Sequence, residues 1–380
     1  MCNVTHDTVA QRLHIGIAGA GLLGRLAAWT LAREGHRVEV FDPAPDEHPH
    51  HDGQGAAGFT AAGMLSPLAE RESADAALAD LGWASIPRWA QVCEALQAPG
   101  PTPLMHQAGS LLVAHGSDLG SARRVLARLE EPGLGMARRQ GEAPHAPAPQ
   151  ALGPDALRAI EPALHSSGGP LHAWLLQGEA HIDAVRTLQA LHQHAHGVQW
   201  HWGQRVLALE AGRLQTVTET HRFDWVFDLR GTGARPECEV RGVRGELVWL
   251  HAPGLGLQRP VRLLHPRHRV YIVPRAGDMV LVGASEIESE DRSPMSLRSA
   301  VELMAAAHSV LPGLAEARIH RLDVNLRPAL PNHHPIVQVM DGLVRINGLY
   351  RHGWLLAPAL LDQALHRAGL LPAHTEPAHA

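Results

Sequence analysis

Lysine is absent from this chain of 380 residues, so all 33 of its basic side chains are arginines. This absence excludes a lysine Schiff base as a catalytic device and the lysine of a phosphate-binding P-loop. Cysteines are few and far apart: Cys2, Cys93 and Cys238. They match no metal-ligand spacing and leave one thiol over in any disulfide scheme, which favours a reducing, cytoplasmic location.

Long basic runs and uninterrupted apolar spans are also missing. With a formal net charge of -5, the chain lacks the positive charge that binds a nucleic-acid backbone. The apolar stretch 13–32 is broken by Arg25 and by glycines, and no cationic segment precedes it, so we expect no membrane or signal segment. The 28 histidines, including His48, His50 and His51, form no HExxH or Cys/His pattern. We therefore predict no metal site.

Hydrophobic residues make up 45% of the sequence, which is enough for the cores of two interlocked domains. The N-terminal region predicts a β-turn-α-β unit with its helix at residues 22–33. The strands predicted for this unit and its continuation are residues 13–18, 37–41, 206–209 and 225–229. A second glycine turn, Arg230-Gly-Thr-Gly-Ala234, follows the last of them. Residues 131–154, rich in Pro, Gly and Ala, are expected to form an exposed loop.

The pattern becomes strand-rich from residue 242 onward. Short β-prone runs at residues 246–250, 270–273 and 279–282, separated by Gly and Pro, predict an antiparallel sheet. We then expect a helix at residues 296–308 and a strand at residues 343–347. The final helix is expected to begin near Pro358, because proline is favoured in the first turn of a helix.

A glycine turn between the first strand and its helix indicates a dinucleotide site. In Gly19-Ala-Gly21-Leu-Leu-Gly24, glycine permits the tight turn, the close approach of a pyrophosphate and the packing of the helix on the sheet. Asp42 ends the second strand, about 20 residues on, where a carboxylate accepts hydrogen bonds from ribose hydroxyls. NAD and FAD sites share this pattern, and a purely structural glycine turn with a surface aspartate is the alternative.

The segment from Asp52 to Pro67 is a long loop of small residues soon after the second strand. Such a backbone can lie flat against a large planar ring, whereas an NAD unit would usually show another βα repeat at this place. The alternative is a flexible glycine linker. The apolar residues Phe59, Met64 and Leu65 within the loop count against a linker.

Seven motifs, in order along nearly the whole chain, carry a resemblance to a known family. They are Gly19 to Gly24 with Asp42, Ala61-Ala-Gly-Met-Leu-Ser-Pro67, Val243-Arg-Gly-Glu246, Tyr271-Ile-Val-Pro-Arg275, Val282-Gly-Ala-Ser285, Leu326-Arg-Pro328, and Gly348-Leu-Tyr-Arg-His-Gly353 leading into Leu355-Leu-Ala-Pro358. In this combination the chain resembles the D-amino-acid oxidase superfamily of FAD-dependent oxidoreductases, and within it the glycine oxidases of thiamine biosynthesis.

The resemblance implies an α/β fold in two domains. A discontinuous FAD-binding Rossmann domain of the glutathione-reductase type would comprise residues 1–90, 180–236 and 326–380. An interleaved α+β substrate domain, built on an antiparallel sheet, would comprise residues 91–179 and 237–325.

Three catalytic residues are implied by the resemblance. Arg327 would bind the substrate carboxylate, Tyr271 would assist it, and Arg351 would be a second active-site arginine. A guanidinium suits this role because its planar fork forms two parallel hydrogen bonds with a carboxylate. The alternatives are an arginine that bonds carbonyl groups or surface carboxylates, and a core tyrosine with a satisfied hydroxyl.

The cofactor-binding residues implied by the resemblance come from the glycine turns, the small-residue loop and the last loop and helix. Val206 among them would meet the adenine end through its backbone. They are Gly19, Gly21, Leu23, Gly24, Asp42, Ala62, Gly63, Met64, Val206, Gly231, Gly348, Arg351, His352, Gly353, Trp354 and Leu355.

The sequence also departs from the family's pattern. His352 stands where asparagine is common, Arg269 stands where the glycine enzymes tend to have histidine, and Asp228-Leu-Arg replaces a small apolar run. Relatives with covalent flavin use a cysteine near the last loop, and this chain has none after Cys238, so non-covalent FAD is expected.

Three functions follow as hypotheses. The first is an oxidase that acts on glycine, sarcosine or a small D-amino acid and transfers a hydride to flavin N5, with O2 as electron acceptor and H2O2 as product. The second is a flavin amine dehydrogenase or an RNA-demodifying oxidase of the same superfamily, although the negative net charge counts against RNA. The third is a flavoprotein without turnover. Assembly into a homo-oligomer is left open.

Overall fold

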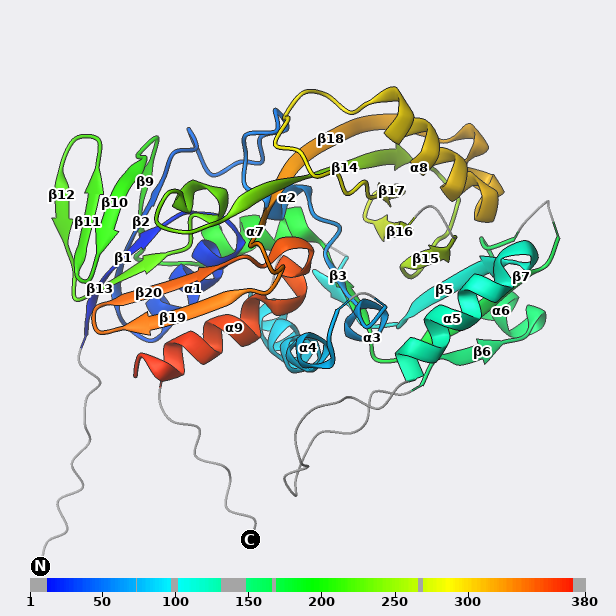
Figure 1. Ribbon diagram of the computed structural model, residues 1–380, viewed down its shortest axis with the longest axis horizontal. Helices are drawn as coiled ribbons and strands as arrows, with labels where there is room; N and C mark the ends of the chain where they lie inside the picture. The colour runs from blue at the N-terminus through cyan, green and yellow to red at the C-terminus, as the bar shows by residue number, and fades with distance from the viewer. Residues whose placement is uncertain are drawn as a thin grey trace, which may run out of the picture.

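The computed structural model describes residues 12–72, 74–96, 102–130, 148–165, 169–265 and 269–371. These ranges form two large sheets, two three-stranded sheets and the helices around them (Figure 1). None of the described helices is long and apolar enough to cross a membrane.

Strand β1 (His14–Ala18) lies inside a six-stranded sheet, between β2 and β13, and is parallel to both. Its sequence, HIGIA, is mostly apolar on both faces, as in strands that are covered from both sides. The chain passes from β1 to β2 on one side of β1, whereas β13 lies on the other side. The carboxyl ends of β1 and β13 therefore flank a topological switch point, which is where open α/β sheets bind ligands. In spatial order the strands are β19 (Ile336–Met340), β20 (Leu343–Asn347), β13 (Trp225–Asp228), β1, β2 (Arg37–Asp42) and β9 (Gln199–Trp202).

Four helices pack with this sheet in one large hydrophobic core. They are α1 (Leu22–Arg33), α4 (Ala76–Leu96), α7 (Ala184–Gln193) and α9 (Gly353–Arg367). Pro358 lies inside α9 and has no N–H for the carbonyl of Trp354, four residues earlier. The indole N–H of Trp89, on α4, donates to that carbonyl at 2.6 Å. A side chain from a neighbouring helix thus replaces the hydrogen bond that the proline removes.

An eight-stranded sheet forms the other half of the molecule (Figure 1). Its longest strands, β14 and β18, run antiparallel to each other from the centre of the molecule outward, and α8 (Leu297–Val310) packs on β14 to β17. In spatial order the strands are β18 (Arg318–Ala329), β14 (Arg241–His251), β17 (Met279–Gly283), β16 (Arg269–Arg275), β15 (Val261–Leu264), β5 (Ser110–His115), β7 (Leu171–Leu176) and β6 (Gln150–Leu152).

Smaller elements complete the described structure. One three-stranded sheet joins β10 (Val206–Glu210), β11 (Arg213–Thr216) and β12 (Thr220–Arg222), and the other joins β3 (Met64–Leu65), β8 (Ala180–Ile182) and β4 (Met105–His106). The remaining described helices are α2 (Ala57–Thr60), α3 (Pro67–Glu70), α5 (Leu119–Glu130), α6 (Pro154–Ile160), η1 (Gly116–Asp118), η2 (Gly231–Ala234), η3 (Pro312–Glu316) and η4 (Tyr350–His352).

The predicted α/β class and most predicted elements are confirmed. The helix at 22–33 and the strand at 343–347 have the expected bounds. The helix at 296–308 is α8, for which the Ser296 side chain accepts a hydrogen bond from the N–H of Ser299 as N-cap.

Three expectations need correction. The final helix begins at Gly353 and not near Pro358, because η4 leads directly into α9. Residues 206–209 form β10 of a separate small sheet. The strands predicted at residues 246–250, 270–273 and 279–282 pair antiparallel as expected, and β15 and β5 of the same sheet are parallel to each other. Of the predicted loop 131–154, residues 131–147 lie outside the described residues, and Gln150–Leu152 forms strand β6.

Candidate active site

A cavity of about 1150 Å³ lies between the carboxyl edge of the six-stranded sheet and the inner strands of the eight-stranded sheet. Four consecutive strands of the first sheet end at it. Gly19 follows β1, Asp42 ends β2, Leu229 follows β13 and Asn347 ends β20, and all four residues line the cavity. The topological switch point of the sheet is therefore where the cavity begins.

Most of the predicted site residues line this one cavity. They are Gly19, Gly21, Leu23, Asp42, Ala62, Gly63, Met64, Val206, Gly231, Tyr271, Arg327, Arg351, His352, Gly353, Trp354 and Leu355. Gly24 and Gly348 are not part of the lining. A Cβ at Gly24 would lie 1.8 Å from the carbonyl oxygen of Gly19, so this glycine allows α1 to approach the turn and does not face the cavity.

The Asp42 carboxylate fixes the geometry of the glycine turn. Its Oδ2 accepts a hydrogen bond from the N–H of Ala20 at 2.6 Å, and its Oδ1 accepts one from the N–H of Ala44 at 2.8 Å. Each carboxylate oxygen has two lone pairs, so both retain capacity to accept from hydroxyl groups. The position fits the ribose-binding role predicted from the sequence.

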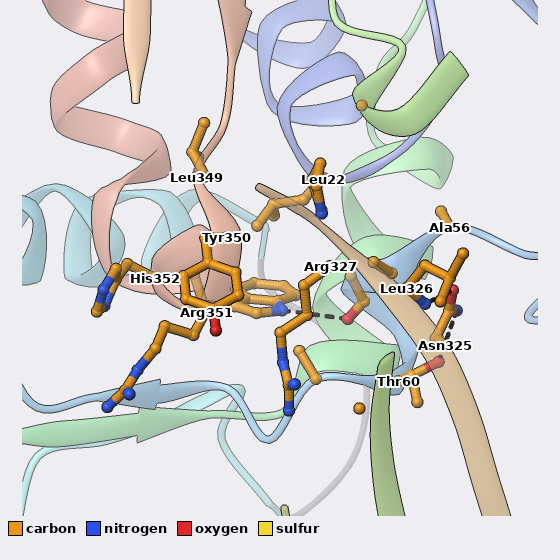
Figure 2. A pocket seen from close by; sticks show the side chains of 18 of the residues that line it. Leu22, Ala56, Thr60, Asn325, Leu326, Arg327, Leu349, Tyr350, Arg351 and His352 are labelled. Atoms are coloured by element: carbon orange, nitrogen blue, oxygen red, sulfur yellow. Dashed lines mark hydrogen bonds between the residues drawn. The ribbon is translucent and has the colours of Figure 1, made fainter. Parts of the chain in front are cut away.

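The small-residue loop after β2 is held at several of its carbonyl oxygens by side chains from distant elements. The donors are Arg292 to Gly53, Asn325 to Gly55 at 3.1 Å, Trp354 to Gly58 at 3.1 Å and Arg275 to Ala62. The amide of Asn325 also donates to the Thr60 hydroxyl at 3.0 Å, as Figure 2 shows. Such a loop has a defined backbone path, which argues against a flexible linker.

Arg327 extends from β18 into the inner end of the cavity. Its Nη1 donates to the carbonyl oxygens of Ser285 at 3.0 Å and Arg244 at 3.4 Å. The guanidinium lies directly over Gly245, where a Cβ would come within 2.5 Å of it, so only glycine leaves it room. In the described ranges Arg327 forms no ion pair with a carboxylate, so its guanidinium remains available to a substrate anion.

Tyr271, on β16, also faces this end of the cavity. Burial raises the pKa of its hydroxyl, which therefore keeps its proton and remains a hydrogen-bond donor. Figure 2 shows Arg327 and Arg351 extending in the same direction on either side of the Tyr350 ring. Arg327 also acts electrostatically on the Tyr271 hydroxyl, so a cation and a hydroxyl donor face the same cavity.

Arg351 differs from Arg327 because it is paired. Its Nη2 lies 2.9 Å from Glu70 and its Nη1 lies 3.4 Å from Glu286. Glu70 is buried and also binds Arg262 at 2.6 Å. Although burial acts to raise it, Arg262 and Arg351 hold the pKa of Glu70 well below its usual range. His352, next to this cluster, has its pKa lowered to about 4 by burial, so its ring is neutral.

The charged residues before the second glycine turn neutralise each other. Arg230 forms two hydrogen bonds with the buried carboxylate of Asp228, at 2.8 and 2.9 Å. Arg230 also donates to the carbonyl of Val206 at 3.5 Å and lines the cavity. The segment Asp228-Leu-Arg230, which stands where the family has a small apolar run, is thus accommodated by an internal ion pair.

The sequence interpretation missed four residues of this site: Glu70, Arg262, Glu286 and Asn325. They lie on or after four different elements, and each is an ordinary polar residue in its local sequence. Glu70 comes three residues after Pro67, the end of the predicted small-residue loop, which is the one signal that pointed toward it.

Comparisons with known proteins agree with this geometry. Residues 14–361 match the family DAO, described as FAD dependent oxidoreductase. A protein of Rhizobium etli named "Putative thiamine biosynthesis oxidoreductase ThiO" is 36% identical over 358 residues, 93% of this chain and 96% of the relative.

Two solved structures share the fold over nearly the full length. Glycine oxidase from Bacillus cereus is 19% identical with a TM-score of 0.76, covering 96% of this chain and 99% of that one. Iminodiacetate oxidase from Chelativorans sp. is 25% identical with a TM-score of 0.75, covering 96% and 97%. The chain therefore belongs to the DAO family of FAD-dependent oxidoreductases, and FAD is its cofactor.

Proposed function

We propose that this enzyme oxidises the carbon–nitrogen bond of a small amino acid or secondary amine, such as glycine, sarcosine or a small D-amino acid. One observation carries the proposal: Arg327 presents a guanidinium without an ion-pair partner in the described ranges to the cavity that Tyr271 also lines, and it acts electrostatically on the Tyr271 hydroxyl. The name of the Rhizobium etli relative and the similarity to a glycine oxidase structure support the same substrate class, and the former supports a role in thiamine biosynthesis.

The cavity has the size and the polar groups that FAD requires. Its outer end has the glycine turn and Asp42 for the diphosphate and ribose, and Val206 at the adenine end. We propose that residues 1–90, 180–236 and 326–380 form the FAD-binding domain, and that residues 91–179 and 237–325 form the substrate domain. In the described ranges no cysteine lines the cavity, which supports non-covalent binding.

The middle of the cavity would hold the isoalloxazine. The small-residue loop after β2 would contribute Ala62, Gly63 and Met64. The first turn of α9 consists of Gly353, Trp354 and Leu355. The first N–H groups of a helix lack intrahelical partners and carry positive partial charge, so we propose that this turn stabilises negative charge on the reduced ring.

The side chains at the inner end would hold the substrate by its carboxylate. Arg327 would bind both carboxylate oxygens, and Tyr271 would donate a further hydrogen bond. Two such contacts fix the position and the face of the α-carbon, and positioning of this kind can supply much of the rate acceleration. FAD, when bound, supplies a hydride acceptor at N5 and a route for the electrons to O2, with H2O2 as product. The oxidised substrate, an imine, would hydrolyse to a keto acid or glyoxylate and ammonia or an amine.

Anaerobic flavin reduction tests the proposal. The FAD-loaded protein is mixed with glycine, sarcosine, D-alanine, D-proline and longer amines without a carboxylate, and the loss of flavin absorbance is recorded. Bleaching by one of the amino acids, followed by rapid recolouring in air, is the expected result. Slow recolouring would indicate a dehydrogenase. Bleaching by none of the compounds would overturn the proposal in favour of a flavoprotein without this activity.

A further inference from the structure

Glu286 carries a negative charge at the inner end of the cavity, where substrate carboxylates are expected. It follows strand β17 and lines the cavity, and its carboxylate lies 3.4 Å from Nη1 of Arg351. The part of the cavity lined by Arg327, Arg351 and Glu70 is called the inner pocket below. The side chain of Glu286 is 47% exposed, so it lies at the edge of the inner pocket and not in the protein core. Arg327 and Arg269 also act on this carboxylate electrostatically.

The inner pocket contains three arginines and two carboxylates. Arg262 and Arg351 both bind Glu70, at 2.6 and 2.9 Å, and Arg351 is also paired with Glu286. Arg327 is the arginine left without an ion pair among the described residues. Three positive and two negative charges leave a net charge of +1, which one substrate carboxylate would neutralise.

Arg269 belongs to the mouth of the cavity. Its side chain is 58% exposed and lies 3.6 Å from Glu72. Arg269 is thus paired with Glu72, a carboxylate outside the five charged groups counted above, so this pair adds no net charge to them.

We propose that Glu286 is a specificity-determining residue that restricts the pocket to substrates with one carboxylate. Its carboxylate is paired with Nη1 of Arg351, which leaves that cation less able to bind a second substrate carboxylate. A second carboxylate would then face Glu286 without a partner, and an unpaired charge is costly in a partly closed site. The inference rests on the proposed function, since it concerns the same substrate pocket.

Glu286→Gln tests this idea, because it removes the charge and keeps the shape. The substrate pair is sarcosine and iminodiacetate, which share the glycine core and differ by a second carboxylate. D-alanine and D-aspartate form the matching pair for the α-carbon substituent. We expect Glu286→Gln to shift kcat/KM toward the dicarboxylate by about tenfold in at least one pair, which corresponds to about 1.4 kcal/mol.

Glu288→Gln is the matched control. Glu288 lies two residues away, is paired with Arg241 at 3.0 Å and does not line the cavity. A second readout needs no turnover: the Kd values of acetate and malonate are measured from the change that each causes in the flavin spectrum. Glu286→Gln should tighten malonate relative to acetate by a similar factor, whereas Glu288→Gln should leave the ratio unchanged.

The outcomes separate this inference from the proposed function. Unchanged ratios in Glu286→Gln, or an equal shift in Glu288→Gln, would overturn the role of Glu286. If no amino acid reduces the wild-type flavin, the proposed function fails, and the malonate-to-acetate ratio still decides the role of Glu286. Glu286→Ala serves as a second variant should the glutamine protein fail to bind FAD.

Discussion

Replacing Arg327 with alanine should abolish most of the activity and leave the fold and FAD binding intact. Its guanidinium contacts two carbonyl oxygens and no carboxylate of the described protein, so its removal leaves no buried charge unpaired. Two unit charges about 4 Å apart interact with about 4 kcal/mol at an effective dielectric constant of about 20. Charged hydrogen bonds contribute about 1.5 to 3 kcal/mol. We therefore expect a loss of about 3 to 4 kcal/mol in transition-state stabilisation, roughly 10²- to 10³-fold in kcat/KM.

The assay is steady-state kinetics on the preferred amino acid, together with the flavin content of the purified variant. Arg318→Ala is the control, because Arg318 lies on the same strand with a 76% exposed side chain and does not line the cavity. Arg327→Lys should recover only part of the activity, since an ammonium keeps the charge but not the planar fork. If the activity of Arg327→Ala stays within about threefold of wild type, the loss is far smaller than the Coulomb energy predicts, and the carboxylate-binding role is refuted.

Three further predictions concern other parts of the site and its support. Tyr271→Phe should lower kcat/KM for carboxylate substrates by about tenfold, because one hydrogen bond of ~1.5 kcal/mol is lost. An unchanged kcat/KM would show that the hydroxyl does not bind the substrate. Because burial lowers the pKa of His352 to about 4, the unfolded chain binds more protons between that value and about 6.5. The free energy of unfolding should therefore rise with pH across this window, and urea titrations of His352→Gln should show a smaller rise. Trp89→Phe should cost about 1 to 3 kcal/mol in urea unfolding, because the carbonyl of Trp354 loses its donor; a change below about 0.5 kcal/mol would contradict that role.

Local patterns in the sequence were sufficient to predict four of the six strands of the first sheet and the helix α1. The glycine turn and Asp42 lie at the ends of β1 and β2, and the helix at 22–33 has the predicted bounds, because each depends on residues close together in the chain. The bounds of the last helix were wrong for the opposite reason. The sequence shows that Pro358 cannot donate a hydrogen bond, but the compensating donor, Trp89, lies on a different helix.

The electrostatics of the site could not be predicted in the same way. Arg327 and Arg351 are both arginines in recognisable motifs, yet only their neighbours in space distinguish them. Glu70 and Glu286 pair with Arg351 across long sequence separations, whereas Arg327 contacts carbonyl groups. Which of the two arginines is paired with carboxylates therefore depends on tertiary contacts that no spacing in the sequence encodes.

The most direct test of a carboxylate-anchored amine oxidation compares glycine with glycinamide, which replaces the carboxylate by a neutral group of similar shape. FAD-loaded protein is mixed anaerobically with each compound, and the rate of flavin bleaching is measured. We predict rapid bleaching by glycine or a related small amino acid and bleaching slower by at least about 100-fold with the corresponding amide, as the loss of a charge-assisted pair requires. Equal rates for acid and amide would contradict the role assigned to Arg327 and with it the proposed mode of substrate binding.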